Sequence, residues 1–259
     1  MNDSIDPATT DATETAKHPS RWPRFLAARL DPDAYLGLHF TVGMIVIVLG
    51  LWLFGGVLEE VLDNDALVRW DMTASGWVHS TTTPVGVRVF EFFTNIGSPV
   101  AMATIAVIGV VVTFVRKHRR LALAWVAAVG GGAIVDGVLK AMIHRTRPQY
   151  AAAFLHGTSY SFPSGHAMGS MIGYGFLAYA IVLTGEWAGW HRQAVFSAAG
   201  LMTLLVGVSR VYIGVHYPSD VVGGWAAGLV WLTVCITGYQ VVSGRSAIRH
   251  PPTPSQDTP

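Results

Sequence analysis

The sequence predicts an all-α integral membrane protein with six transmembrane helices, and three observations support this fold class. Of the 259 residues, 51% are hydrophobic and only 13% are charged, whereas soluble domains carry about 25% charged residues. Six separate apolar runs approach the roughly 20 residues that a helix needs to cross the hydrocarbon core of a bilayer. Lysine and arginine residues gather at every second boundary between these runs, a pattern that is typical of multi-pass membrane proteins.

The predicted spans are residues 38–57, 99–115, 121–140, 166–184, 194–210 and 221–242. Small residues recur at 130–132 and 169–175, and we expect these stretches to face other helices, because small side chains let helix backbones approach closely. Residues 38–242 are expected to form one six-helix domain. The polar segments 1–37 and 243–259 are expected to be disordered cytoplasmic tails. No cleavable signal peptide is visible, so the first apolar run is expected to act as an uncleaved signal anchor.

Basic residues predict the orientation of the chain. The densest cluster, residues 116–120, separates the second and third spans, and other lysines or arginines precede the first span, join the fourth to the fifth and follow the sixth. With six spans, all of these segments lie on one side, which the positive-inside rule makes cytoplasmic. Residues 58–98, 141–165 and 211–220 then face the extracytoplasmic side of the cell (plasma) membrane. Aromatic residues in the first of these segments favour helices that lie in the interface over a compact loop.

Residues suited to phosphate chemistry fall at helix ends and loops on the predicted extracytoplasmic side. They are Lys140, Arg147, Ser164, Gly165, His166, Arg210, His216 and Asp220. Phosphoryl transfer spreads charge over three equatorial oxygens, so catalysis depends mainly on positioning and on cations. Lys140, Arg147 and Arg210 can supply those cations, the arginines through bidentate contacts. Ser164 would cap a helix whose free N–H groups attract an anion, and Gly165 would let its backbone come close to the phosphate.

Two histidines can divide the remaining chemistry. One neutral imidazole attacks phosphorus and forms a phosphohistidine, and the other protonates the leaving oxygen and later activates water. Asp220 follows His216 by four residues, and a carboxylate on one ring nitrogen would fix the tautomer and stabilise the imidazolium. This favours His216 as the nucleophile and His166 as the acid/base. The reverse assignment stays open, because only the carboxylate beside His216 argues against it.

These residues resemble, in order, the three signature motifs of the phosphatidic acid phosphatase type 2 superfamily. The matching segments are Lys140-x6-Arg147-Pro148, Pro163-Ser164-Gly165-His166 and Ser209-Arg210-x5-His216-x3-Asp220. That superfamily includes lipid phosphate phosphatases, glucose-6-phosphatase and vanadium haloperoxidases. The resemblance implies that Lys140, Arg147, Ser164, Gly165 and Arg210 bind phosphate. It also implies that His166 is the acid/base and that His216, paired with Asp220, is the nucleophile of a metal-independent enzyme that needs no cofactor.

The expected function is hydrolysis of a lipid phosphate or pyrophosphate, with a phosphatidate-like lipid or undecaprenyl diphosphate as the substrate. A phosphotransferase that passes the phosphoryl group to another lipid or sugar would use the same residues. A transporter is disfavoured because its site would lie near the midplane of the membrane. The net charge of +1 does not indicate nucleic acid as a partner. Membrane lipids are the expected partners, and the oligomeric state is not predicted.

Several other polar residues receive structural interpretations. Asp136 lies four residues before Lys140, and we expect an ion pair that orients the lysine, although a carboxylate inside a span is also a functional candidate. We expect His144 and Arg145 to be solvated or to face lipid headgroups. Tyr160 and Tyr212 are expected to pack at the interface. A zinc site built from His166, His216 and Asp220 is disfavoured because the three neighbouring cations would repel the metal.

Overall fold

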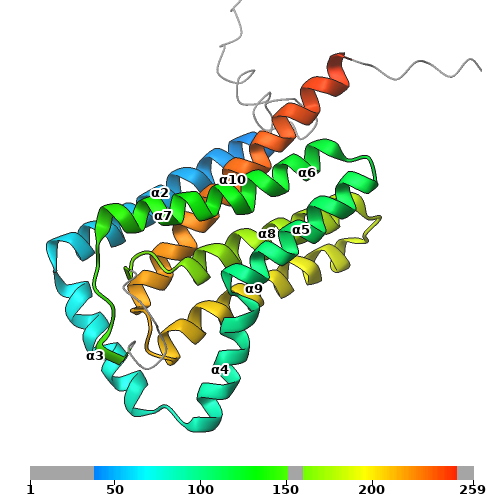
Figure 1. The fold of residues 1–259 in the computed structure, drawn as a ribbon. Coiled ribbons are helices and arrows are strands. Elements are labelled where there is room, and N and C mark those ends of the chain that lie inside the picture. The colour runs from blue at the N-terminus through cyan, green and yellow to red at the C-terminus, as the bar shows by residue number, and fades with distance from the viewer. Residues whose placement is uncertain (1–37, 151–159, 250–259) are drawn as a thin grey trace, which may run out of the picture.

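The computed structural model describes residues 38–150 and 160–249, and all regular structure within these ranges is helical (Figure 1). The tail predicted at residues 1–37 therefore lies outside the described residues. The elements are α2 (Leu38–Asp63), α3 (Ala66–Ser80), α4 (Pro84–Ile96), α5 (Pro99–Val115), α6 (Arg119–Trp125), the π-helix η1 (Val126–Gly130), α7 (Gly131–Ile143), α8 (Gly165–Thr184), α9 (Gly189–Tyr212) and α10 (Pro218–Arg249).

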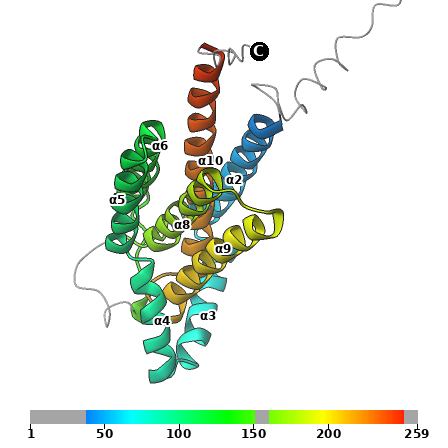
Figure 2. The same ribbon diagram turned by 90° about the vertical axis from the view of Figure 1, so that its right-hand side faces the viewer.

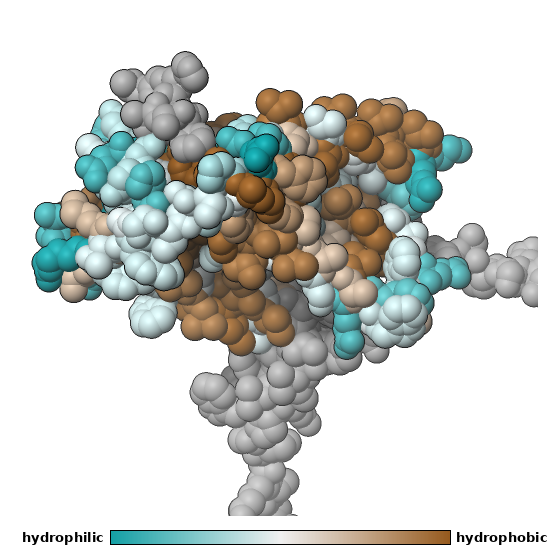
Figure 3. Space-filling model, turned by 90° about the horizontal axis from the view of Figure 1, so that it is seen from below, coloured by the Kyte–Doolittle hydropathy of each residue, from teal (hydrophilic) through white to brown (hydrophobic). Residues whose placement is uncertain are grey.

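The six predicted spans are confirmed within the described residues. The helical segments long and apolar enough to cross a membrane are Phe40–Leu62, Pro84–Val115, Arg119–Ile143, Gly165–Thr184, Gly189–Tyr212 and Pro218–Gly244. Large apolar side chains on these helices point outward, among them Trp52 on α2 and Phe114 on α5, and Figure 3 shows apolar side chains over much of one face. A soluble protein rarely exposes so much contiguous apolar surface, whereas lipid covers it in a membrane.

Glycines bring α10 and α8 into close contact. A Cβ atom on Gly224 would lie 2.6 Å from the carbonyl oxygen of Ser164, and one on Gly228 would lie 2.9 Å from that of Met168. The same contact places the start of α10 beside the start of α8, where the Ser164 N–H donates to the carbonyl oxygen of Asp220 at 2.9 Å. Two of the predicted motifs are therefore held together by backbone packing.

The segment 58–98 consists largely of helices, as expected for its aromatic-rich sequence. Helix α2 continues to Asp63, and α3 and α4 follow as a pair (Figure 1). Thr83 caps α4 by accepting the Gly86 N–H at 3.1 Å, and Ser98 caps α5 by accepting the Ala101 N–H at 3.2 Å. Figure 2 shows α3 and α4 at the end of the bundle opposite the turn between α5 and α6.

The third and sixth spans differ in detail from the sequence prediction. One turn of π-helix, η1, interrupts the third span, and the indole of Trp231 donates to the carbonyl oxygen of Ala128 at 3.0 Å. Helix α10 continues to Arg249, so the disordered tail expected from residue 243 does not begin there. Residues 250–259 lie outside the described part of the chain.

Candidate active site

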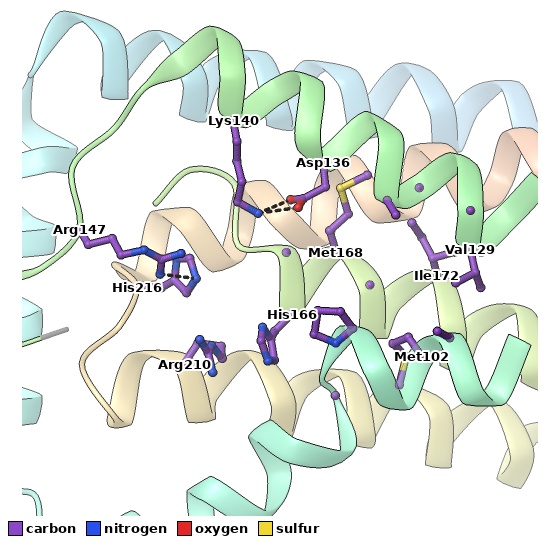
Figure 4. Close-up of a pocket in the computed structure, with 18 residues that line it drawn as sticks. Met102, Val129, Asp136, Lys140, Arg147, His166, Met168, Ile172, Arg210 and His216 are labelled. Atoms are coloured by element: carbon purple, nitrogen blue, oxygen red, sulfur yellow. Dashed lines mark hydrogen bonds and ion pairs between the residues drawn. The ribbon is translucent and has the colours of Figure 1, made fainter. Parts of the chain in front are cut away.

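One cavity brings together most of the residues that the sequence selected. It has a volume of about 510 Å³ and lies where α7, α8 and α9 meet the turn before α10 (Figure 4). The predicted residues that line it are Lys140, Arg147, Gly165, His166, Arg210 and His216. The remaining two, Ser164 and Asp220, are fully buried and lie directly behind this lining. Segments far apart in the sequence thus form a single site.

His216 is held in place by the turn that precedes α10. The N–H groups of Val215 and His216 both donate to the carbonyl oxygen of Arg210, at 3.1 and 3.2 Å. Gly214 has a φ of +75°, a conformation that a residue with a side chain rarely adopts. This turn folds His216 back over the end of α9. The Nδ1 atom of His216 then lies 3.3 Å from Oδ2 of Asp220.

The hydrogen bonds around His216 assign its tautomer. An Arg147 guanidinium nitrogen lies 3.1 Å from Nε2 of His216. Because arginine can only donate, Nε2 must accept, and the proton belongs on Nδ1, facing Asp220. Burial, together with the nearby Arg147 and Arg210, lowers the pKa of His216 to about 4, against the opposing effect of Asp220. His216 is therefore a neutral imidazole at pH 7 with a lone pair on the cavity side.

His166 occupies the first turn of α8 and lines the cavity together with His216 and Arg210 (Figure 4). No carboxylate forms an ion pair with His166 within residues 38–150 and 160–249. The two histidines therefore differ in their surroundings, since only His216 has a carboxylate on its ring. This difference is the basis on which a nucleophile can be told from an acid/base.

The beginning of α8 provides an anion-binding helix terminus. Ser164 occupies the N-cap position, as predicted, but its side chain makes no capping hydrogen bond, and its buried hydroxyl has no protein partner among the described residues. The N–H groups of the first helical turn have no partner within the helix, and the helix dipole favours negative charge there. A Cβ atom on Gly165 would lie 2.8 Å from both Oδ2 of Asp136 and Nζ of Lys140. A side chain at position 165 would thus displace the charged groups of Asp136 and Lys140.

The expected ion pair between Asp136 and Lys140 is confirmed. The ammonium group lies 2.6 Å from Oδ1 and 2.5 Å from Oδ2 of the carboxylate, and both side chains line the cavity (Figure 4). The pair is one turn apart on α7, which is the spacing at which helical side chains meet. Asp136 therefore fixes the ammonium group of Lys140 at the cavity wall beside Gly165.

Arg210 is anchored by a residue that the sequence did not single out. One of its guanidinium nitrogens donates to Oγ1 of Thr94 on α4 at 2.9 Å. The Thr94 hydroxyl also lies 2.8 Å from Oγ of Ser209. The Nε of Arg210 is buried and has no protein partner among the described residues. This N–H group can therefore still donate a hydrogen bond to a ligand. A single threonine between apolar and amide residues carries no sequence signal for this role.

Arg145 contradicts the prediction that it is solvated. Its side chain is only 9% exposed, and it donates to Oδ1 of Asp220 at 2.6 Å and to Oδ2 of Asp71 at 2.8 Å. The pKa of Arg145 is raised, because the attraction of Asp220 and Asp71 outweighs the opposing effect of burial. The sequence signal for Asp71 was a lone carboxylate in the apolar stretch of α3. Its partner could not be read from the sequence, since the two residues are 74 positions apart.

The remaining polar residues largely match their structural interpretations. His144 is exposed and ends α7 in the left-handed conformation, and its ring contacts that of Tyr160. The hydroxyl of Tyr212 accepts the N–H of Thr83 at 3.3 Å, and the ring packs 4.3 Å from that of Phe90. Within the described residues, no three histidine, cysteine, aspartate or glutamate side chains are grouped to hold a metal ion.

The fold and site define a membrane-embedded phosphatase, and the chain belongs to the PAP2 superfamily. The sequence profile of that superfamily matches residues 120–242, which include every predicted site residue. Its phosphatase and diphosphatase members are metal-independent hydrolases, and this protein is a membrane lipid phosphatase rather than a transporter.

Individual relatives support this assignment over much of the chain. Phosphatidylglycerophosphatase B of Bacillus subtilis is 34% identical over 181 residues, which cover 70% of this chain and 88% of the relative. The crystal structure of a transmembrane PAP2-type phosphatidylglycerolphosphate phosphatase from Bacillus subtilis superposes with a TM-score of 0.66 at 28% identity, and the match covers 82% of this chain and 98% of that structure. Lipid A 1-phosphatase of Rhizobium johnstonii is 30% identical over 132 residues, or 46% of this chain and 49% of the relative.

Proposed function

We propose that this protein removes the phosphate group from a lipid phosphomonoester of the phosphatidylglycerophosphate or phosphatidate kind, through a phosphohistidine formed on His216. The observation that carries the proposal is the position of His216. Its Nδ1 faces Asp220 at 3.3 Å, and its Nε2 accepts from Arg147 on the cavity side. A neutral imidazole with its lone pair facing an anion-binding cavity is suited to attack phosphorus.

The proposed reaction has two steps. In the first, Nε2 of His216 forms a bond to phosphorus while the bond to the ester oxygen breaks, and His166 gives a proton to the departing lipid alcohol. The positive charge on His216 is stabilised by Asp220. In the second step, His166 takes a proton from water, the resulting hydroxide attacks phosphorus and the N–P bond breaks. Inorganic phosphate leaves and His216 returns to its neutral form.

The other predicted residues are proposed to bind the phosphate. Arg147 and Arg210 line the cavity and can each present two N–H groups to the equatorial oxygens, where charge accumulates in the transition state. Lys140 adds a third cation. Ser164 and Gly165 contribute the start of α8, where the helix dipole and the N–H groups of the first turn favour an anion. Together these groups would replace the neutralising role that a metal ion has in other phosphatases.

The shape of the cavity supports a lipid rather than a soluble substrate. Beyond the cationic end, its lining is apolar and comes from α5, η1, α7 and α8: Pro99, Met102, Ala103, Val129, Gly130, Ala133, Met168 and Ile172. A phosphate ester with a hydrocarbon tail would place its headgroup among the cations and its tail along this wall. Both curated relatives are named as phosphatases of lipids, which agrees with that arrangement.

We propose that the site faces the extracytoplasmic side. The support is the separation between the cavity end of the bundle and the basic turn between α5 and α6 (Figure 1), because basic turns stay in the cytoplasm. The test is cysteine labelling in intact cells on a Cys235→Ala background. A membrane-impermeant maleimide should label Ser80→Cys, beside the cavity end, and should not label Lys117→Cys until the cells are lysed. The reverse pattern would overturn the orientation.

The central experiment measures phosphate release by the purified protein from phosphatidylglycerophosphate, phosphatidate, undecaprenyl diphosphate and a soluble sugar phosphate. We expect the lipid monoesters to be the best substrates and His216→Ala to abolish turnover while leaving membrane insertion intact. His166→Ala should lose more activity with alkyl esters than with activated aryl phosphates, which need less acid catalysis. Near-normal turnover of His216→Ala would refute the nucleophile assignment.

The same experiment separates hydrolysis from phosphoryl transfer. A hydrolase releases one inorganic phosphate for each lipid alcohol formed, with or without added alcohols. If phosphate release stays below lipid turnover and a phosphorylated acceptor accumulates, the phosphohistidine is resolved by an alcohol and the protein is a phosphotransferase. A strong preference for undecaprenyl diphosphate would instead assign the diphosphatase activity.

A further inference from the structure

Helix α3 contributes a buried carboxylate that the reaction described above does not use. Asp71 is fully buried, whereas its chain neighbours Trp70 and Met72 are largely exposed. Its Oδ1 accepts the N–H of Ser219 at 3.1 Å, and its Oδ2 accepts from the Ser219 hydroxyl and from Arg145 at 2.8 Å. Because both contacts with Ser219 lie at the start of α10, the buried carboxylate acts there as a cap supplied by another helix.

Arg145 joins this carboxylate to the one beside the nucleophile. One of its guanidinium nitrogens donates to Oδ2 of Asp71 at 2.8 Å, and the other donates to Oδ1 of Asp220 at 2.6 Å. The face of the guanidinium lies 4.5 Å from the ring centre of Tyr217. The group is therefore clamped between two buried carboxylates and an aromatic ring, and cannot turn toward either carboxylate alone.

The two oxygens of Asp220 have separate partners. Oδ1 accepts from Arg145, while Oδ2 accepts the Tyr217 N–H at 2.8 Å and lies 3.3 Å from Nδ1 of His216. The hydroxyl of Ser161 also donates to Oδ2. The direction in which Asp220 presents Oδ2 to the imidazole thus depends on where Arg145 holds Oδ1.

We propose that Asp71 and Arg145 are positioning residues of the reaction: Asp71 holds Arg145, and Arg145 holds Asp220 ionised and turned toward His216. The proposal rests on the proposed role of His216 as the nucleophile. Neither Asp71 nor Arg145 lines the cavity, so both act through Asp220 and not on the phosphate. Because one guanidinium is shared by two carboxylates, Asp71, Arg145 and Asp220 together carry a net negative charge. This charge favours the imidazolium that forms on His216.

Replacing Asp71 and replacing Arg145 should shift the protonation of His216 in opposite directions. Asp71→Asn removes one negative charge and lets the guanidinium pair with Asp220 alone, which weakens the hold of Asp220 on His216. Arg145→Gln removes the positive charge and leaves two buried carboxylates uncompensated. The other charged or titratable groups facing His216 are Arg147 from the loop after α7, Arg210 from α9 and, through the cavity, His166 from α8 and Lys140 from α7. None of these changes in either variant.

The test is the pH profile of kcat/KM for phosphate release from a short-chain lipid phosphate, compared with wild type. Asp71→Asn should lower kcat by roughly a hundredfold, as expected for a misplaced catalytic group, with KM nearly unchanged. It should also move the acidic limb of the profile, where His216 becomes protonated, to lower pH. Arg145→Gln should move the same limb to higher pH. Arg145→Lys keeps the charge but cannot bridge both carboxylates, so kcat should fall while the limb stays in place. The double variant Asp71→Asn/Arg145→Gln should lose less activity than the two single losses combined.

Matched controls come from the same region of the chain. Asp65→Asn and Arg69→Gln remove exposed charges beside or on α3 and should leave kcat, KM and the limb at wild-type values. Competitive inhibition by inorganic phosphate reports an intact cavity in each variant. If a single variant does not fold, the kcat and the acidic limb of Arg145→Lys and of the double variant are compared with those of wild type instead.

Distinct outcomes overturn distinct claims. Wild-type kcat in both Asp71→Asn and Arg145→Gln, or a loss of activity in these two variants with no shift of the acidic limb, would overturn the positioning role and leave at most a structural one. Near-normal turnover of His216→Ala would instead overturn the proposed function itself. The two failures are therefore distinguishable.

Discussion

The guanidinium of Arg147 lies 3.1 Å from Nε2 of His216, on the side of the ring that faces the cavity. The same guanidinium nitrogen donates to the carbonyl oxygen of Val215 at 2.8 Å. Arg147 thus occupies the direction from which Nε2 would approach phosphorus. A phosphate that enters the cavity offers the guanidinium a stronger, charged acceptor, and the transfer of that hydrogen bond frees the lone pair of Nε2. Binding of the substrate and release of the nucleophile are then one event.

The pH dependence of the reaction should reflect the surroundings of His216. Burial, together with Arg147 and Arg210, lowers its pKa to about 4, so the imidazole stays neutral and nucleophilic down to that pH. We expect the acidic limb of kcat/KM to lie well below the pH of about 6.5 at which an unperturbed histidine titrates. Asp220→Asn removes an interaction that raises this pKa, so the limb should move lower still. Dividing the variant's profile by the wild-type profile cancels ionisation of the substrate. An acidic limb that lies near pH 6.5 in the wild type and does not move in Asp220→Asn would contradict this prediction.

Gly165→Ala should inactivate the enzyme without unfolding it. The added Cβ would lie 2.8 Å from both Asp136 and Lys140, closer than real contacts allow, so the ammonium group must move away from the cavity wall. We expect kcat/KM to fall by about a hundredfold, the effect of displacing a catalytic group by about 1 Å. The control is Gly137→Ala on α7, where a Cβ meets nothing within 4 Å. Equal activity of the two variants would argue against the close approach of α7 to α8.

Asp136→Asn tests whether the ion pair on α7 orients Lys140. The lysine would lose the carboxylate that holds it at 2.5 Å and would sample several rotamers, so we expect kcat/KM to fall by roughly tenfold, the equivalent of one charged hydrogen bond. Lys140→Ala should cost more, since the cation itself is lost. In the double variant the losses should not add, because the two residues act as a unit. Additive losses would show that Asp136 has a separate role.

Thr94→Val removes the contact between α4 and a phosphate-binding arginine. The hydroxyl accepts from Arg210 at 2.9 Å, and valine has almost the same shape. Without this acceptor Arg210 should be less well oriented, and we expect KM and the inhibition constant of inorganic phosphate to rise by about tenfold, as for loss of a hydrogen bond to a charged group. Thr94→Ser keeps the hydroxyl and should behave as wild type. Unchanged phosphate inhibition in Thr94→Val would contradict this role.

Gly130→Leu should distinguish long from short lipid substrates. Gly130 lines the apolar part of the cavity, and a Cβ there meets nothing within 4 Å, so the leucine can be accommodated without displacing a neighbour. Its side chain would fill space that we assign to the hydrocarbon tail. Turnover of a long-chain lipid phosphate should fall, while turnover of a short-chain analogue stays near wild type. Equal effects on both substrates would place the tail elsewhere.

Much of the fold and most of the site could be predicted from local features of the sequence. Spans are read from length and hydrophobicity, because a bilayer requires about 20 apolar residues per helix whatever the neighbouring helices are. The predicted phosphate-site residues also meet in space, since each lies at a helix end and α7, α8, α9 and α10 bring those ends together. The prediction failed where the environment of a residue depends on a distant partner. Arg145 was expected to be solvated, and Thr94 and Ser161 were not considered, because their partners belong to other helices.

The sequence by itself determined the membrane class and the six spans, and it selected the residues that we propose to bind phosphate, because these properties follow from composition and from short-range spacing. Only the tertiary structure decided which hydrogen bonds and ion pairs those residues form. It placed Asp220 on Nδ1 of His216 and Arg147 on Nε2, which gives the two histidines the different surroundings on which their proposed roles rest. It also buried Asp71 against Arg145. The physical reason is that hydrogen bonds and ion pairs act over about 3 Å in space, a distance that packing of the helices sets and that position along the chain does not.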